Sequence, residues 1–431
     1  MCKELSYKRI FTPVVTMWLM IKQRLESDHT LDKVVSDIKS GQTDLLSEGK
    51  VLSEALKSES NSSYSKARKR LSLEFLKEVL FRTGRVAEEE SGQSVQAVIL
   101  DGTHYRVESP TIDILNKYPR VVTSKPLFTT LIRAVAVFSA VSGSLIDVQW
   151  ADYFQSELQL ATEILKRNQG LLFIADACYG IFSFFQASRE FKTHLLSRLT
   201  KSRAMKLVRL NNLKLIPGTD VILQWHHSRA DKLLKGASAE PVTGRFICYR
   251  LTGNGFRPKD IYLFCDITDY NLYSTENLIE LFGQKWNIEI YFRHIKSTLK
   301  PDSFNSKSSE MTDKEIATGL IAYNLIRYCM QKVAVRHNKP FLKISFSGSR
   351  RRVLGFLLTA FSRDRTDQKK PKFTFEKLLL SISGCIIANT INKPAIQPRK
   401  IRPEGNRKFP TFSGSREVEI RKLLNKYGAV D

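Results

Sequence analysis

The sequence predicts an α/β protein with a mixed sheet, preceded by helices and followed by basic segments. Between residues 94 and 192, apolar runs of strand length alternate with segments of helical period. This alternation is typical of a sheet covered by helices. A strand-rich stretch follows from 193 to 266, after which helical periodicity returns. The β-rich stretch therefore separates the α/β segment that ends near 192 from the helical segments after 266.

Composition restricts the classes of partner. The chain has 431 residues, 42% of them hydrophobic, which is enough for several compact units. Its net charge of +25 favours polyanionic partners and salt-sensitive binding, although a ribosome or a membrane surface also fits the charge alone. The six cysteines are scattered without a C-x-x-C pair, which argues against a zinc site or a disulfide framework and indicates a reducing compartment. The sequence contains no run of 18 or more apolar residues, so we expect no transmembrane helix. The apolar stretch Phe11–Ile21 is short and contains Pro13, which argues against a signal peptide.

Residues 1–93 have helical periodicity. Thr30 is placed to cap a helix that runs to Ile38, with Gly41 as its stop. Residues 43–63 are rich in Ser, Glu and Gly and predict a flexible connection. Residues 65–83 pair a basic turn with an amphipathic helix. This pattern fits a helical DNA-binding region and a plain helical bundle about equally.

Residues 94–192 predict the first part of the α/β region. A buried strand ends at Asp101, before a Gly102-Thr103 turn. Two apolar runs around the turn at Ser142-Gly143 predict a hairpin or a meander. The remaining elements are a helix over 153–166, a strand over 170–176 that ends in Asp176, and a helix over 182–191.

The next segments predict strands first and helices later. Between 193 and 266, strands are expected at 206–210, 213–216, 220–226, 244–252 and 260–268. In residues 267–338, helices are expected at 281–300 and 313–337. The region 339–431 combines helices at 353–361 and 375–382 with basic segments at 349–352, 369–372 and 398–408, which suit contacts with an anionic partner.

The helix predicted over 281–300 gathers charge on one face. Residues four and seven apart share a face, so Phe282, Lys285, Glu289, Arg293 and Lys296 fall within one arc. One interpretation is a solvated charged face with i,i+4 pairs. The other is a metal-binding carboxylate flanked by bases that bind phosphate.

Three acids at particular places favour the second interpretation. Asp101 and Asp176 each end an apolar strand, and ligands of open α/β sheets bind at the carboxyl ends of strands. A single aspartate there usually makes only a turn or a cap. Together with Glu289, in a strongly basic chain, the two can hold a pair of divalent cations that act on a phosphodiester. Mg²⁺ suits such hard oxygen ligands.

The motifs around these acids resemble the DDE transposases of the IS-four insertion-sequence family. They are DGT at Asp101, DACYG at Asp176, and W-x-I-E-x-x-F-x-x-x-K around Glu289. The resemblance implies a ribonuclease-H-like core interrupted by an all-β insertion domain. In that arrangement 94–192 and 267–338 form the core, 193–266 the insertion, 1–93 a helical DNA-binding region and 339–431 a basic C-terminal region.

The resemblance also implies chemistry and partners. Asp101, Asp176 and Glu289 correspond to the catalytic, metal-binding acids, with two Mg²⁺ ions for which Mn²⁺ can substitute. The partners are double-stranded DNA, as transposon ends and target, and a second subunit in a homodimer on DNA. The location is the prokaryotic cytoplasm, at the nucleoid.

The family's Tyr-Arg-Glu-Lys signature falls on Phe282, Lys285, Glu289 and Lys296. Lys285 keeps the charge without the bidentate fork of arginine, and Phe282 lacks the phenol hydroxyl. We expect Lys285, Arg293 and Lys296 to contact DNA phosphates.

Aromatic side chains complete the predicted DNA contacts. Relatives that form a DNA hairpin stack a flipped base on an aromatic ring, and Tyr262 and then Trp225 are the candidates here, with packing in the strand core as the alternative role. Trp286 is expected to pack on its helix.

The predicted function is cut-and-paste DNA transposition by strand cleavage at transposon ends and strand transfer into target DNA. Two rivals remain. A stand-alone metal-dependent nuclease would hydrolyse DNA without joining strands. A catalytically silent DNA-binding protein derived from a transposase would bind without metal and would not cleave.

Overall fold

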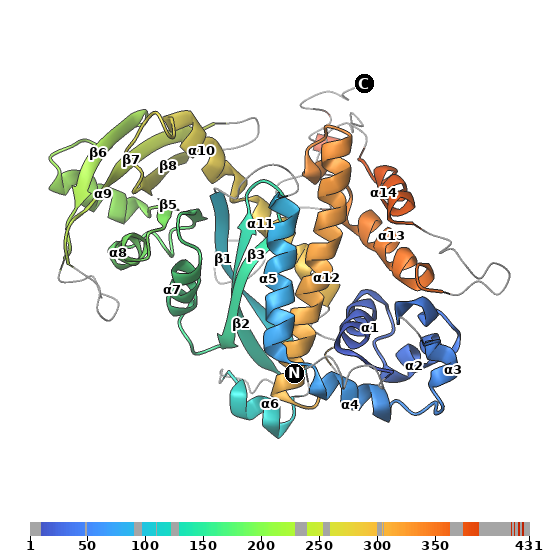
Figure 1. Cartoon of the computed structure of the whole chain (residues 1–431). Coiled ribbons are helices and arrows are strands. Elements are labelled where there is room, and N and C mark those ends of the chain that lie inside the picture. Colours follow the sequence, from blue (N-terminus) through green and yellow to red (C-terminus); the bar gives the residue numbers. More distant parts are fainter. Residues whose placement is uncertain are drawn as a thin grey trace. The chain divides into compact units, whose positions relative to one another are not determined.

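The computed structural model describes residues 10–47, 50–89, 97–108, 110–121, 129–228, 239–252, 259–299, 304, 306–362 and 374–387, together with the isolated positions 415, 418, 421, 422 and 425. Residues Met1–Cys385 form one compact unit and Ile386–Asp431 a second. The elements labelled β1 to β8 and α1 to α14 in Figure 1 lie in the first unit. The basic segments predicted at 369–372 and 398–408 lie outside the described residues.

A mixed sheet of eight strands runs through the described part of the first unit, in the order β3-β2-β1-β4-β5-β8-β7-β6. β1, β4 and β5 are parallel, and the other neighbouring strands pair antiparallel. The predicted α/β class is confirmed. Antiparallel pairing of β5 with β8 continues the same sheet into the strands after residue 193. The strands are β1 (Ala97–Val107), β2 (Thr130–Ser139), β3 (Leu145–Asp152), β4 (Leu172–Ala175), β5 (His194–Arg198), β6 (Thr219–Trp225), β7 (Val242–Leu251) and β8 (Lys259–Cys265).

The predicted hairpin is the β2–β3 pair, and its turn contains Gly143. That residue has φ +66°, a conformation that side chains with a Cβ rarely adopt. A Cβ there would also lie 2.9 Å from Cε1 of Tyr291. Both constraints select glycine, and they bring the turn against the helix that carries Tyr291.

Three local predictions are wrong. Residues 206–210 lie in helix α9 (Lys201–Leu210) and 213–216 form no strand, because the buried residues of α9, Ala204, Leu207 and Val208, follow a helical spacing and Thr200 caps the helix. The connection predicted over 43–63 contains the short helices η1 (Asp44–Leu46) and α3 (Leu52–Ala55), and α4 (Ser62–Arg70) begins within it.

In the N-terminal region, α2 (Leu31–Lys39) begins at the predicted cap, where the Thr30 side chain accepts from the Lys33 amide at 3.2 Å. Helix α5 (Leu73–Glu89) follows α4 and buries Leu76 and Leu80. No described helix has the length and apolarity needed to cross a membrane.

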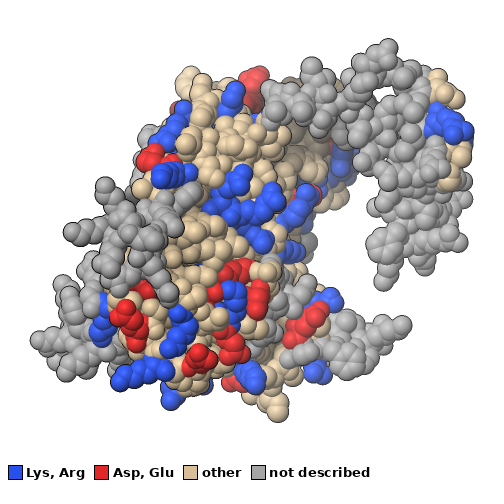
Figure 2. All heavy atoms as spheres, turned by 90° about the vertical axis from the view of Figure 1, so that its right-hand side faces the viewer, with Lys and Arg blue, Asp and Glu red and all other residues tan. Residues whose placement is uncertain are grey.

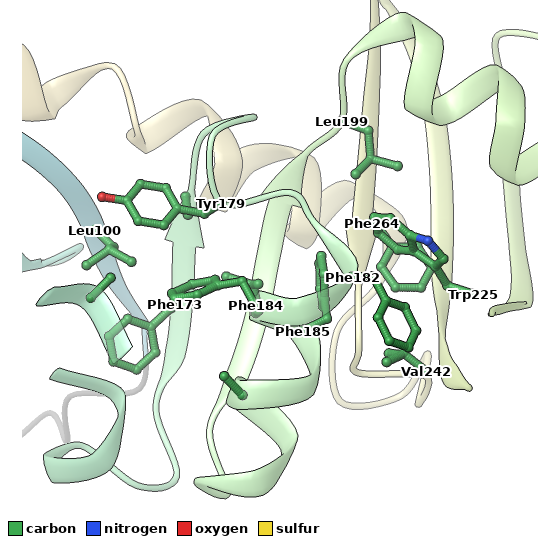
Figure 3. Packing of buried hydrophobic residues seen from close by; sticks show 14 of the residues in the cluster. Leu100, Phe173, Tyr179, Phe182, Phe184, Phe185, Leu199, Trp225, Val242 and Phe264 are labelled. Atoms are coloured by element: carbon green, nitrogen blue, oxygen red, sulfur yellow. The ribbon is translucent and has the colours of Figure 1, made fainter. Parts of the chain in front are cut away.

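Helices α7 (Glu157–Arg167), α8 (Phe182–Glu190) and α9 bury their apolar sides in one core with the sheet. Figure 3 shows aromatic rings of this core, including Trp225 beside Phe264. Phe264 meets Phe185 edge-on, with ring centroids 4.9 Å apart and planes at 82°. Such edge-to-face pairs add to the stabilisation from burial alone.

Helix α12 (Ser309–Arg336) is buried along most of its length and confirms the helix predicted over 313–337. A helix that is buried on all sides has to sit between other elements rather than on a surface. In Figure 1 it is the long orange helix beside α5. It packs against α1 (Pro13–Leu25), α5, α6 (Ile112–Lys117), α11 (Asn287–Leu299), α13 (Phe346–Thr359) and α14 (Phe375–Ser383).

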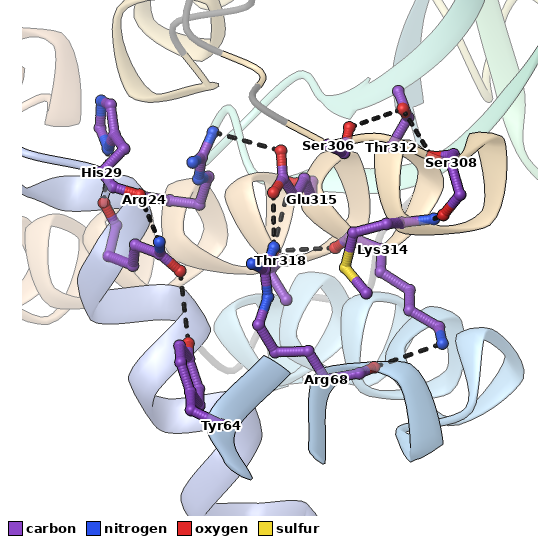
Figure 4. A network of polar contacts seen from close by, with 12 residues as sticks. Arg24, His29, Tyr64, Arg68, Ser306, Ser308, Thr312, Lys314, Glu315 and Thr318 are labelled. Carbon is purple, nitrogen blue, oxygen red and sulfur yellow. Dashed lines mark hydrogen bonds and ion pairs between the residues drawn. The ribbon is translucent and has the colours of Figure 1, made fainter. Parts of the chain in front are cut away.

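The first turns of α12 carry three consecutive buried charges. Glu315 accepts from Nη2 of Arg68 at 2.5 Å and lies 3.8 Å from Nη1 of Arg24 (Figure 4). Lys314 donates to the backbone oxygen of Lys69 at 2.8 Å, near the end of α4. These contacts bind α1 and α4 to α12.

The third of these charges, Asp313, reaches a different part of the molecule. Its carboxylate accepts from the Tyr118 hydroxyl at 2.5 Å, from Lys117 at 2.5 Å and from the Trp150 indole at 2.9 Å. Lys117 ends α6 and Trp150 lies in β3. The start of α12 thus joins the N-terminal helices to the sheet through charged hydrogen bonds, which are stronger than neutral ones.

We predict that Glu315→Gln lowers the free energy of unfolding by about 3–5 kcal/mol, because it leaves two buried guanidinium groups without their carboxylate. Denaturant unfolding measures the change. Glu376→Gln is the matched control, since Glu376 forms an exposed ion pair with Arg336. Equal unfolding free energies for the two variants would contradict the role assigned to Glu315.

Candidate active site

Two of the three predicted acids meet at one edge of the parallel strands. The last residue pair joining β1 to β4 is Ile99 with Ile174, and Asp101 and Asp176 each follow two residues later. Asp176 comes directly after the end of β4, as predicted. Asp101 does not end its strand, because β1 continues to Val107 through its pairing with β2. Matching positions on adjacent parallel strands bring the two aspartates together.

A lysine compensates the charge of Asp101. Lys285 Nζ lies 2.6 Å from Asp101 Oδ2, and both side chains are largely buried. Lys285 is the residue that ends α10 (Thr275–Gln284). This charged hydrogen bond therefore ties the end of α10 to β1.

The continuous helix predicted over 281–300 is wrong, because the chain turns at Lys285–Trp286 and a new helix, α11, begins at Asn287. Phe282 of α10 and Ile288 of α11 are both buried. Six residues apart, they would point roughly 120° away from each other on one straight helix. The break lets both be buried. It also leaves Trp286 62% exposed, so the packing predicted for Trp286 is wrong.

Glu289 lies in the first turn of α11 and is exposed, as are Arg293 and Lys296. Among the described residues, no three His, Cys, Asp or Glu side chains lie close enough together to hold a metal ion. Asp101, Asp176 and Glu289 are all described, so the three predicted acids do not all lie within ligating reach of one another. The contacts that the structure does show are the ion pair of Asp101 with Lys285 and the matching positions of Asp101 and Asp176 on adjacent strands. Lys296 lies near β1: burial lowers the pKa of His104, and the charges of Arg133 and Lys296 add to the effect.

A further carboxylate, which the sequence analysis missed, lies beside Asp101. Glu157 is the first residue of α7, after a capping box formed by Ser156 and Gln159. A Cβ on Gly102 would lie 2.4 Å from the Glu157 carboxyl carbon, so the carboxylate covers this glycine. The Tyr179 hydroxyl donates to Glu157 Oε1 at 2.7 Å and holds it there.

The pKa shifts of Tyr179 and Cys178 agree with negative charges close to them. The pKa of Tyr179 is raised by burial first and by Glu157 second, with a further contribution from Asp101. The pKa of Cys178 is raised by burial, Glu157 and Asp176. Glu157 and both aspartates therefore contribute to one negative field, which favours a cation.

The loop after Asp176 is held by hydrogen bonds. The Cys178 amide donates to Asp176 Oδ1 at 2.7 Å, and Ser197 Oγ donates to the Asp176 backbone oxygen at 2.7 Å. Arg203 donates to the backbone oxygen of Ala177 at 2.5 Å. The Asp176 side chain is thereby fixed in direction. The capping pattern S-E-L-Q reveals where α7 starts, but no sequence signal brings Glu157 or Arg203 to this edge.

Tyr262 and Trp225, the candidates for base stacking, lie in the hydrophobic core with 7% and 9% exposure. Trp225 packs edge-on against Phe264, with centroids 5.3 Å apart and planes at 88°. Their positions correspond to the alternative role, packing in the strand core.

Lys and Arg side chains gather in a band across the face that carries α13, α14 and the N-terminal helices, while Asp and Glu lie mainly lower on that face (Figure 2). Helix α13 carries the predicted basic run: Arg351 and Arg352 are exposed. Arg350 donates to the backbone oxygen of Ser297 at 2.8 Å, which ties α13 to α11.

Residues 93–325 match the family described as "Transposase DDE domain", a range that contains all three predicted acids. The chain belongs to this family. It is 25% identical over 307 residues to the transposase InsG for insertion sequence element IS4 of Escherichia coli K12. That match covers 68% of this chain and 66% of the relative, which is just under two thirds of the relative's length.

Among solved structures, this DDE-domain chain is similar to the piggyBac transposase in its synaptic complex with hairpin DNA. The TM-score is 0.40 at 10% identity, over 87% of this chain and 76% of that chain.

We predict that Gly102→Ala lowers the free energy of unfolding by about 1–3 kcal/mol, because its methyl group overlaps the Glu157 carboxylate that Tyr179 holds in place. Gly283→Ala is the control: Gly283 lies in α10 with open space around it, and alanine there is expected to be neutral or stabilising. A double-mutant cycle with Glu157→Ala, measured by denaturant unfolding, tests the cause. If Gly102→Ala lowers the free energy of unfolding by the same amount in the Glu157→Ala protein as in the unmutated protein, overlap with the Glu157 carboxylate is not the cause of the destabilisation.

Proposed function

We propose that this protein is a DNA transposase that cuts strands at transposon ends and joins the freed ends to target DNA by cut-and-paste transposition. The observation that carries the proposal is the pair Asp101 and Asp176 at matching positions of adjacent parallel strands, within the range of the family match. An acidic strand edge in a chain of net charge +25 fits a metal-assisted reaction on a polyanion.

We infer a ribonuclease-H-like core. The strand order β3-β2-β1-β4, with β2 reversed against β1, supports it. β5 (His194–Arg198) continues the parallel part of the sheet just beyond residue 192. In this division 94–192 and 267–338 form the core and 193–266 is a β-rich insertion that extends its sheet. Residues 1–93 and 339–431 are the helical N-terminal and basic C-terminal regions that bind DNA.

The acids fit divalent cations. Asp101 and Asp176 offer hard oxygen ligands, and the ammonium of Lys285 against Asp101 indicates that this position attracts positive charge. Glu289 is the proposed third ligand, and its exposed position on the first turn of α11 leaves its side chain able to turn. A bound pair of Mg²⁺ ions, or Mn²⁺ in their place, would activate the attacking water or 3′-hydroxyl and stabilise the leaving oxygen.

The protein's own cations would bind and orient the DNA. Arg293 and Lys296, one and two turns after Glu289, are placed to contact phosphates beside the cleaved bond. Lys285 is the third proposed phosphate contact once it leaves Asp101. The proposed assembly is a homodimer that pairs two DNA ends in the bacterial cytoplasm, at the nucleoid.

We predict that Asp101→Asn and Glu289→Gln each abolish strand cleavage while binding to end DNA remains, because each removes a metal ligand and leaves the basic surface intact. The assay uses labelled duplexes made from the DNA that flanks the coding region, with Mg²⁺. Glu163→Gln, at an exposed residue that pairs with Lys166, should cleave normally.

The same assay separates the rival functions. Products joined to a second duplex are expected, and cleavage without joining would indicate a nuclease. Binding without cleavage by the unmutated protein, with or without metal, would indicate a silent DNA-binding protein. Full cleavage by either acid variant would overturn the assignment of these residues.

A further inference from the structure

A buried arginine on α12 lies in a cage of aromatic rings. Arg327 is 1% exposed. Its guanidinium carbon lies 4.9 Å from the ring centroid of Tyr291, 5.2 Å from Tyr323, 5.4 Å from Phe346 and 5.6 Å from Phe341. These rings come from α11, α12, α13 and η3 (Phe341–Lys343), so the cage lies where four elements meet.

The polar contacts of Arg327 are to neutral groups. Nε donates to the Tyr323 hydroxyl at 3.0 Å, and Nη2 lies 2.9 Å from Nδ1 of His294. Burial, followed by the charges of Arg327 and Arg293, lowers the pKa of His294 to about 3, so its ring is neutral and accepts from Nη2. The His294 ring stacks on Phe346 at 4.1 Å. No carboxylate in the described part of the chain forms an ion pair with Arg327.

A buried cation without a carboxylate is an expensive way to fill a core. Replacing buried ions by apolar side chains of similar volume is often neutral or stabilising. What arginine adds is direction, because its planar fork fixes hydrogen bonds and stacked rings in one geometry. Two of the groups that it fixes, Tyr291 and His294, belong to α11.

These two residues lie on the side of α11 opposite Glu289. At about 100° per residue, they are rotated roughly 160° and 140° from it. The β2–β3 turn closes the same side, since the Gly143 backbone lies directly against the Tyr291 ring. The Tyr323 hydroxyl donates to the Gly143 backbone oxygen at 2.7 Å. The back of α11 is therefore held by both α12 and the hairpin.

We propose that Arg327 is a positioning residue for strand cleavage: by holding Tyr291 and His294 it fixes the rotation of α11 and thereby the direction in which Glu289 faces the aspartates. The inference rests on the proposed role of Glu289. A rotation of α11 by part of a turn would move the Glu289 carboxylate by more than the roughly 1 Å that already impairs catalysis.

The test is Arg327→Lys, which keeps the charge and removes the fork, against Arg336→Lys, an exposed arginine of the same helix. At saturating end DNA, Arg327→Lys should lower the cleavage rate by about tenfold or more. Its DNA dissociation constant should equal that of the control, and its half-saturating Mg²⁺ concentration should rise. If Arg327 only stabilised the fold, Arg327→Lys would lower the folded fraction and DNA binding together, and the half-saturating Mg²⁺ concentration would not change.

His294→Phe removes the same contact from the α11 side. It keeps an aromatic ring against Phe346 but removes the nitrogen that accepts from Arg327. It should show the same selective loss, and it serves as the test where Arg327→Lys does not fold. The positioning role is overturned if a folded Arg327→Lys or His294→Phe variant cleaves at the rate of the unmutated protein, with the same Mg²⁺ dependence, while Glu289→Gln is inactive. Full cleavage by Glu289→Gln instead overturns the proposed function.

Discussion

The rest of the structure depends on the charged hydrogen bonds at the start of α12. Asp313, Lys314 and Glu315 are consecutive and buried. Asp313 binds Lys117 of α6 and Trp150 of β3, whereas Lys314 and Glu315 bind α4, and Glu315 also lies near Arg24 of α1. Buried ion pairs add little net stability compared with apolar packing, but breaking one is costly. Their effect is therefore to specify one arrangement. An N-terminal region displaced from α12 would leave two arginines and an acid unpaired.

The same helix carries this constraint to the candidate active site. Nine residues after Glu315, Asn324 donates to the Leu145 backbone oxygen at 2.9 Å and accepts from the Leu145 amide at 2.8 Å, which fixes the start of β3. One turn later, Arg327 holds α11 from behind. The sheet supplies Asp101 and Asp176, and α11 supplies Glu289. Helix α12 is thus the common support of two parts that have to meet for the proposed chemistry.

Local chemistry explains which predictions from the sequence are confirmed. Thr30 caps α2 through its own side chain, and the hairpin at Gly143 follows from turn residues between apolar runs. Asp176 ends a short buried strand, as its pattern indicates. The wrong predictions depend on contacts distant in sequence. The helix break at Lys285 follows from the ion pair with Asp101 and from two buried stripes that are out of phase. The partner of Gly102, Glu157, comes from a helix whose position the sequence does not specify.

Charge balance at the acidic edge links the site to the helix break. Glu157 lies against Gly102 beside Asp101, and Asp176 occupies the matching position after β4. Like charges along one partly buried edge repel one another. Lys285 offsets this repulsion at Asp101, and as a single ammonium it does so without the bidentate grip of an arginine. A divalent cation at Asp101 Oδ2 would compete with that ammonium. The Lys285 side chain that makes this contact belongs to the junction between α10 and α11. The proposed cation binding at the sheet edge would therefore be coupled, through one ion pair, to the start of the helix that carries Glu289.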